Sequence, residues 1–272
     1  MRLWALYGKM DLLWITRDFK QFLAWGVSDV IVSVSSIFGM ALLAERFSGI
    51  GVWSTSQIEF MLGFSVVNRG LMEAFFSYNL CFISRRIGRG QLDHVLIQPQ
   101  PIWLTLMTEG FSPFFGGMMI LPGVALLVWS FQHLHLKLTV FWVCTLVLLQ
   151  ISSLVISLAF QFIWGSIAFW APRAAEEISS STMNLMQTLK SYPLEGLGVG
   201  MTVTLLSVLP VGFLGWFPCR SLLGIDSSPV ALWGTPLAAV VASGLTALIF
   251  GKGMQRYGRT GSQRYTNQGH RS

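Results

Sequence analysis

The chain of 272 residues has 53% hydrophobic and only 11% charged residues, and its mean hydropathy is +0.61. Average soluble domains carry roughly 25% charged residues, so this chain has too few charges to cover a soluble protein of its size. Its 20 Phe, 11 Trp and 12 Met instead suit a surface that faces lipid. The net charge of +6 falls in the connectors and at both ends rather than on one basic face, which argues against nucleic acid as a partner.

The first predicted element is an amphipathic helix over residues 1–23. Apolar residues recur there at spacings of three and four, namely Leu3, Leu6, Tyr7, Met10, Leu13 and Trp14. Lys9, Arg17 and Lys20 lie elsewhere around the helix, an arrangement typical of a helix in the lipid headgroup layer. An ordinary soluble helix has the same pattern, but the apolar segment that follows favours the interfacial interpretation.

Six segments are long and apolar enough to cross a bilayer as helices of about 20 residues. They are 25–44, 58–82, 104–129, 138–170, 196–217 and 233–250. The pattern predicts an all-α membrane protein whose permease-like domain, 24–251, contains six transmembrane helices. Pro113 and Pro122 predict kinks in the third span. Residues 252–272 are rich in Gly, Arg and Ser and are predicted to form a disordered tail.

The connectors 84–101 and 171–191 are polar and are predicted to lie outside the hydrocarbon. If both termini are cytoplasmic, 14 of the 18 Lys and Arg residues lie on the cytoplasmic side and three on the other. This asymmetry satisfies the positive-inside rule and favours an even number of crossings. The connector 218–232, with Arg220 and Asp226, is expected on the outer side, where it could dip into the membrane.

Polar residues inside the predicted spans are candidates for function: Asp29, Asn68, Arg69, Glu73 and Glu109. Arg69 and Glu73 are four residues apart and can pair on one helix face. Charged groups at that depth are costly unless they face protein or water, so the second span should pack inside the bundle. We interpret Arg69 and Glu73 as a structural pair, with substrate lining as the alternative, whereas Asp29 and Glu109 can reach interfacial water.

Motifs for catalysis are absent from the sequence. It has no G-x-x-x-x-G-K-[ST] loop, no H-E-x-x-H and no G-x-S-x-G. The three cysteines are scattered, and His133 and His135 have no neighbouring ligand residues for a metal. The sequence therefore predicts a protein that is not an enzyme and binds no cofactor itself.

The connector ISRRIGRGQLDHVLIQPQP, residues 83–101, is the most informative stretch. A basic segment followed by Gly-x-Leu-Asp and then a Pro resembles the cytoplasmic hairpin of six-span permeases from type-2 ABC exporters, a bacterial family of single-domain permeases. Further likeness to that family's second half lies in Tyr192-Pro193, Pro210, Phe217-Pro218 and Leu222-Leu223-Gly224. The resemblance extends over nearly the whole chain.

In that family the hairpin is a short coupling helix that docks into a groove of a separate ATPase subunit. A helix starting near Gly90 would place Leu92, Val95 and Leu96 on one apolar face, with a positive rim beside it. The predicted ATPase-coupling residues are Arg85, Arg86, Arg89, Gly90, Leu92, Asp93, Val95, Leu96 and Pro99, the last of which would end the helix. Without the resemblance, a basic loop that merely obeys the charge rule explains the segment equally well.

The resemblance implies a permease subunit of an ATP-driven exporter in the bacterial inner membrane, surrounded by lipid, with both termini cytoplasmic. A second permease, identical or related, would complete the path, and separate ATPase subunits would bind ATP and Mg. The alternative is an ion- or proton-coupled secondary transporter, in which Asp29, Arg69, Glu73 and Glu109 would form the relay. A membrane-embedded enzyme or a scaffold is a third possibility.

Overall fold

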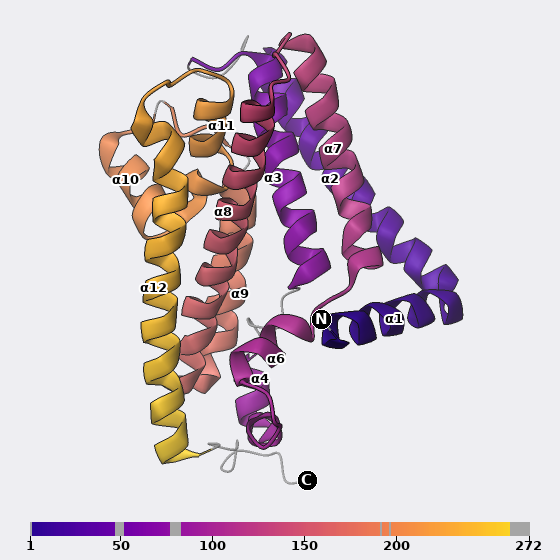
Figure 1. The fold of residues 1–272 in the computed structure, drawn as a ribbon, viewed down its shortest axis with the longest axis vertical. Coiled ribbons are helices and arrows are strands. Elements are labelled where there is room, and N and C mark those ends of the chain that lie inside the picture. The colour runs from indigo at the N-terminus through magenta and orange to yellow at the C-terminus, as the bar shows by residue number, and fades with distance from the viewer. Residues whose placement is uncertain (1, 47–51, 77–82, 191, 196, 262–272) are drawn as a thin grey trace.

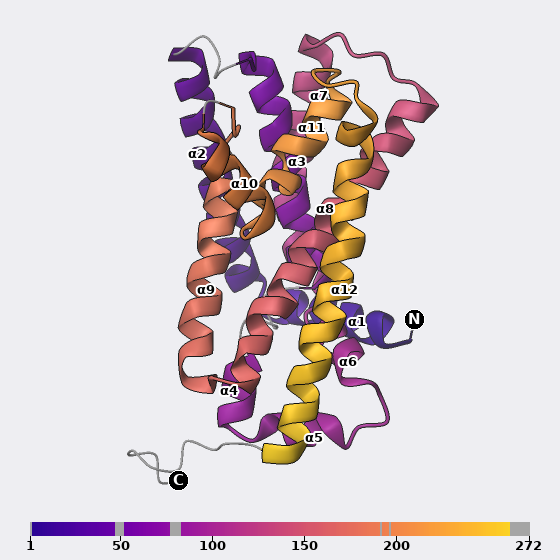
Figure 2. The same ribbon diagram turned by 90° about the vertical axis from the view of Figure 1, so that its left-hand side faces the viewer.

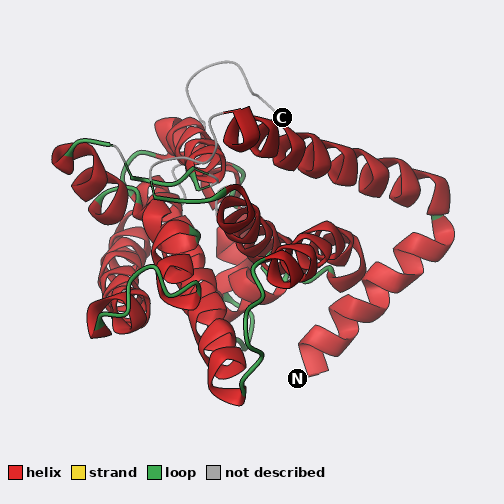
Figure 3. Ribbon diagram, turned by 90° about the horizontal axis from the view of Figure 1, so that it is seen from above, coloured by secondary structure: helices red, strands yellow, loops and turns green. Residues whose placement is uncertain are grey.

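The computed structural model describes residues 2–46, 52–76, 83–190, 192–195 and 197–261. Within these segments the chain forms helices and connectors and no strand (Figure 3). In chain order the elements are α1 (Arg2–Arg17), α2 (Phe19–Arg46), α3 (Thr55–Phe75), α4 (Ile83–Gly88), α5 (Gln91–Leu96), α6 (Ile102–Thr108), α7 (Pro113–His133), α8 (Val140–Gly165), η1 (Ser166–Phe169), α9 (Pro172–Leu189), α10 (Val199–Ser207), η2 (Pro210–Leu214), α11 (Trp216–Leu222) and α12 (Pro229–Thr260).

The long helices run side by side along the long axis of the molecule, and α1 lies across them (Figure 1). The short helices α4, α5 and α6 gather at one end, beside the C-terminal end of α12 (Figure 2). We call this the hairpin end. The segments α10, η2 and α11 lie toward the other end, which we call the opposite end.

Helices α3 and α7 pack closely because glycines line their contact. A Cβ atom at Gly116 would lie 2.3 Å from the backbone nitrogen of Ala74, and one at Gly123 would lie 2.8 Å from that of Val67. From the α3 side, a Cβ atom at Gly63 or Gly70 would lie 3.0 or 2.9 Å from a backbone nitrogen of α7. Small residues that let two backbones touch are typical of helix pairs in membranes, where burial in lipid provides no hydrophobic drive.

Local sequence signals explain where several helices begin. Ser54 and Gln57 form a capping box at the start of α3, and the Thr139 hydroxyl caps α8. Pro113 is at the first turn of α7, where the missing N–H costs nothing. The Asp11 carboxylate of α1 accepts a hydrogen bond from the backbone N–H of Phe114 at 3.1 Å, so α1 is attached to the start of α7.

In the first half of the chain, the structure differs from the predicted spans at three places. The predicted second span, 58–82, is represented by α3, which ends at Phe75, and residues 77–82 of that span lie outside the described residues. Helix α2 begins at Phe19, six residues before the predicted first span. The predicted third span, 104–129, is two helices, α6 and α7, because the chain breaks between Glu109 and Ser112. Pro113 therefore starts a helix rather than kinking one, and only Pro122 lies inside α7.

The second half differs more. Residues 171–191, predicted to be a connector outside the hydrocarbon, contain the 18-residue helix α9, which runs beside α8 (Figure 2). Residues 196–217, predicted as the fifth span, contain α10, η2 and the start of α11 instead of one long helix. The predicted tail also begins too early, because α12 continues to Thr260; the rest of that tail, 262–272, lies outside the described residues.

Two described helical stretches, Val140–Phe169 and Pro229–Thr260, are long and apolar enough to cross a membrane, with mean hydropathies of 2.3 and 1.7. Their outer faces carry large exposed apolar side chains such as Phe141, Leu237 and Val240. Side chains of this kind in continuous rows indicate a surface that contacts lipid.

Candidate functional site

The hairpin end is organised around the turn between α4 and α5. Gly90 lies in this turn with φ 68°, a left-handed conformation that glycine adopts without strain, and its N–H donates to the carbonyl of Ile87 at 3.1 Å. Helix α5 then runs across the end of the bundle (Figure 2). The helix ends at Leu96, before Pro99.

Two arginines of α4 are paired with carboxylates of other helices. Arg85 pairs with Glu176 near the start of α9, and Arg86 pairs with Glu109 at the end of α6, at 2.5 Å. Helix α1 packs against α6 beside the second pair, and burial of Tyr7 together with the Glu109 charge raises the pKa of this tyrosine, while the Arg86 charge opposes the shift. Two of the three arginines of the predicted positive rim are therefore paired with carboxylates of the same chain. Arg89 is exposed and forms no ion pair with any residue that the structure describes.

A third contact joins α5 to α12. The hydroxyl of Tyr257 donates to the Asp93 carboxylate at 2.6 Å. The ring of Tyr257 is buried against Phe169, with the ring centres 6.1 Å apart. The hairpin is thus attached to the last long helix as well as to α9 and α6.

Two residues of the apolar ridge predicted on α5, Leu92 and Val95, face inward, whereas the third, Leu96, is exposed. Leu92 is fully buried and Val95 is 7% exposed. Leu92 belongs to an apolar group that we call the hairpin cluster, which consists of Ile83, Ile87, Leu92, Leu106, Phe162, Ala168, Phe169, Ala175 and Tyr257. The prediction failed because the same helical spacing that makes a docking ridge also makes a face that packs on the chain's own core. At the C-terminal end of α5, the exposed apolar side chains are those of Leu96, which is 42% exposed, and Ile97, which is 82% exposed.

The predicted intramembrane polar residues do not gather in one site. Asn68 is buried, and its Oδ1 accepts a hydrogen bond from Ser157 of α8 at 3.2 Å. The pairing of Arg69 with Glu73 stays a prediction. Asp29 is half-buried, ten residues into α2, about 15 Å from the start of the helix. Glu109 lies at the hairpin end with Arg86.

A buried lysine lies where the sequence predicts a polar connector. Lys190, directly after α9, is 4% exposed, and its ammonium donates to the backbone carbonyl of Ser65 at 3.1 Å. In return, the Ser65 hydroxyl donates to the carbonyl of Lys190 at 3.3 Å. This reciprocal pair fixes the end of α9 to the middle of α3.

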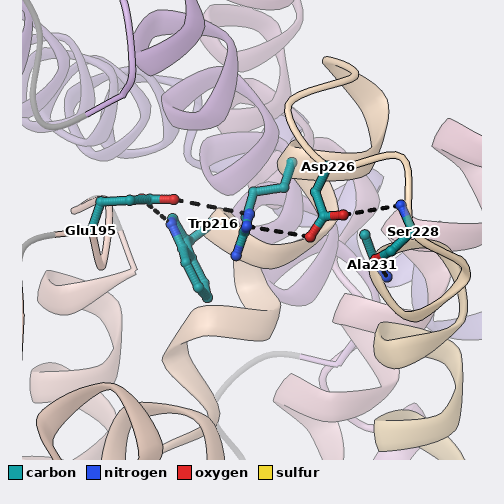
Figure 4. Close-up of polar contacts among 6 residues, drawn as sticks. Glu195, Trp216, Asp226, Ser228 and Ala231 are labelled. Carbon is teal, nitrogen blue, oxygen red and sulfur yellow. Dashed lines mark hydrogen bonds and ion pairs between the residues drawn. The ribbon is translucent and has the colours of Figure 1, made fainter. Parts of the chain in front are cut away.

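A polar network lies toward the opposite end of the bundle (Figure 4). The indole N–H of Trp216 donates to Glu195, and Arg220 stacks on the Trp216 ring with 4.9 Å between the guanidinium carbon and the ring centre. Arg220 pairs with Asp226 at 3.2 Å, and the Asp226 carboxylate accepts from the backbone N–H of Ser228 at 3.0 Å. These hydrogen bonds, with the Arg220 charge, lower the pKa of Asp226.

Sequence reasoning missed Glu176, Tyr257 and Lys190 as contact residues. A signal was present for Tyr257, because Phe250, Met254 and Tyr257 continue the helical spacing beyond the predicted end of the last span. For Lys190 no local signal exists, because its burial depends on α3. Within the described part of the chain, no group of three or more His, Cys, Asp or Glu residues is placed to hold a metal.

The fold and its lipid-facing helices define a helical membrane protein. The family model described as ABC-2 family transporter protein matches residues 30–261, and the chain belongs to that family of type-2 ABC permeases. Members of this family are membrane transport components that usually work with separate ABC ATPases. No curated protein and no solved structure matches the chain.

Proposed function

We propose that the chain is the membrane-spanning permease subunit of an ATP-driven exporter in the inner membrane, with the hairpin end in the cytoplasm. A second permease, identical or related, completes the path, and ATPase subunits that hold ATP and Mg bind below the hairpin. Lys190 is buried in the bundle and no longer counts toward the cytoplasmic side. The other Lys and Arg residues predicted on that side still far outnumber those predicted on the opposite side, which supports this orientation.

The observation that carries the proposal is the set of three contacts that the hairpin makes. Arg85, Arg86 and Asp93 each bind a residue of a different segment: Glu176 of α9, Glu109 after α6 and Tyr257 of α12. A force applied to α5 by a partner is therefore passed to three segments at once. A basic loop without a mechanical role has no need of such contacts.

The surface that we assign to the ATPase is formed by Arg89, His94, Leu96 and Ile97, all of which are exposed. Leu96 and Ile97 supply the apolar part that a groove would cover, and Arg89 supplies a free cation beside it. This set keeps Arg89 and Leu96 from the predicted coupling residues and leaves out the buried Leu92 and Val95.

The path between two permeases is assigned to the exposed side of α9. Glu177, Ser181, Asn184 and Thr188 follow one another at spacings of four, three and four, so they form a polar stripe along this helix. A polar stripe beside apolar membrane-spanning helices is costly against lipid and suits a surface covered by a second subunit or by water.

The test is affinity purification of the tagged chain from membranes of its native host, with identification of P-loop ATPases that accompany it. Replacement of Ile97 by Asp should remove the ATPase, since it places a charge on the proposed contact. The matched control is Val52→Asp, which changes a side chain that is 68% exposed away from the hairpin and should leave the ATPase bound. Absence of any P-loop ATPase from the wild-type complex, or full retention by Ile97→Asp, would refute the proposal.

A further inference from the structure

A groove of about 510 Å³ lies between α6, α8 and α12 in the half of the bundle near the hairpin end. Large apolar side chains form its walls, including Trp103, Met107, Phe162 and Phe250. The groove is hollow because Ala159 and Gly251 are small. A Cβ atom at Gly251 would meet no other atom within 4 Å, so this glycine opens directly onto empty space.

The chemistry of the lining selects an apolar occupant. Only two hydroxyl side chains border the groove, and both donate their protons to helix carbonyls: Ser243 to Ala239 at 2.8 Å and Thr246 to Ala159 at 3.2 Å. No charged side chain lines it. A polar ligand would lose its hydrogen bonds to water there without replacement, whereas a hydrocarbon chain would lose nothing.

The position of the groove identifies the source of that hydrocarbon. Two of its three walls are α8 and α12, the helices that are long and apolar enough to span a membrane, so lipid chains surround its mouth. Its volume is within the range of about 300–1,000 Å³ that holds ligands in proteins. Lys252 directly follows Gly251, and Lys252 and Arg259 are exposed and form no ion pair with a described residue. Exposed cations near the membrane surface attract lipid phosphates.

We propose that the groove binds one phospholipid from the leaflet at the hairpin end, with an acyl chain between α6 and Gly251 and the phosphate beside Lys252. The chain would contact Met107, Phe162 and Phe250, which pack in or against the hairpin cluster that also holds Leu92. The lipid therefore completes the packing around the coupling hairpin. This inference does not depend on the identity of the ATPase or of the cargo.

The experiment compares two leucine substitutions in α12 of the full chain. Gly251→Leu fills the groove, whereas Gly244→Leu adds the same side chain at another glycine with open space around its Cβ but outside the groove lining. Both raise helix propensity equally. The purified proteins are titrated with phosphatidylglycerol in detergent and the bound lipid is counted by native mass spectrometry. Wild type and Gly244→Leu should hold one lipid tightly, and Gly251→Leu should bind it about tenfold more weakly or worse.

Two further measurements make the result decisive. Phosphatidylglycerol with a diazirine in its acyl chain should label peptides of α6 and α12 in wild type and lose this labelling in Gly251→Leu. Lys252→Gln should weaken phosphatidylglycerol but not diacylglycerol, because only the former has a phosphate. A melting temperature of lipid-free Gly251→Leu at or above that of wild type excludes misfolding as the cause. Equal lipid retention by the two leucine variants, or labelling spread evenly over the apolar helices, would overturn the proposal.

Discussion

The two ends of the molecule are held together by different kinds of contact. At the hairpin end, two of the three polar contacts, Arg85 with Glu176 and Asp93 with Tyr257, join residues that are remote in sequence; the second pair is 164 residues apart. Toward the opposite end, the polar network stays within neighbouring segments, with Glu195 and Trp216 only 21 residues apart. The first arrangement links separate helices, and the second shapes one continuous stretch of chain (Figure 4).

This difference has a mechanical consequence. A displacement of α5 cannot occur without moving α12 or breaking the Asp93–Tyr257 hydrogen bond, and the same holds for α4 with α9 through Arg85 and Glu176. At the opposite end, the Arg220 and Asp226 contacts end at the cap of α12, and the Trp142 indole of α8 donates to the Leu222 carbonyl of α11 at 2.9 Å. The hairpin contacts therefore join α4 and α5 to α9 and α12, as the proposed function requires.

Replacement of Leu92 by Asp should give the largest loss of stability at the hairpin end. Leu92 is fully buried in the hairpin cluster, so the substitution buries a carboxylate without a partner. We expect a loss of at least about 3 kcal/mol of stability and loss of folded protein. Melting in detergent and recovery of monodisperse protein measure the effect. The control variant Ile97→Asp should have the melting temperature of wild type. If Leu92→Asp also melts like wild type, Leu92 faces outward, and the buried position of this side chain is wrong.

The contrast between Leu92 and Lys190 explains how far the sequence can predict this molecule. Helix periodicity correctly predicted that Leu92 and Val95 share one face of a short helix, but periodicity does not reveal what covers that face. Helix α9 was missed because its Ser, Thr, Asn and Gln residues lower the hydropathy below that of a span, although they follow a helical pattern. Lys190 is buried only because α3 provides the Ser65 carbonyl. Such tertiary contacts leave no local signal.

The link between α5 and α12 can be isolated by a double-mutant cycle on Asp93 and Tyr257. Asp93→Ala and Tyr257→Phe should each reduce stability by about 1–2 kcal/mol, because each leaves the partner without its 2.6 Å hydrogen bond. The double variant should lose about 1 kcal/mol less than the sum of the two. Chemical denaturation in detergent provides the three values. Strict additivity would show that the two residues act independently and that α12 is not tied to the hairpin through this bond.

The opposite end should show a smaller effect that depends on pH. The pKa of Asp226 is lowered below its ordinary value of 3.8, chiefly by hydrogen bonds from Ser228, with Arg220 adding to them. A lowered folded-state pKa means that the ionised carboxylate stabilises the fold above pH 3.8 and that this contribution is lost as the pH falls further, through the folded-state pKa. Asp226→Asn should therefore melt at a lower temperature than wild type at pH 7, and the gap should narrow below about pH 4. Thermal melts of both proteins in detergent from pH 7 to pH 3 measure this gap. If the gap stays constant over that range, the Asp226 carboxylate contributes nothing through its charge, and the local network would rest on Trp216 and Glu195 alone.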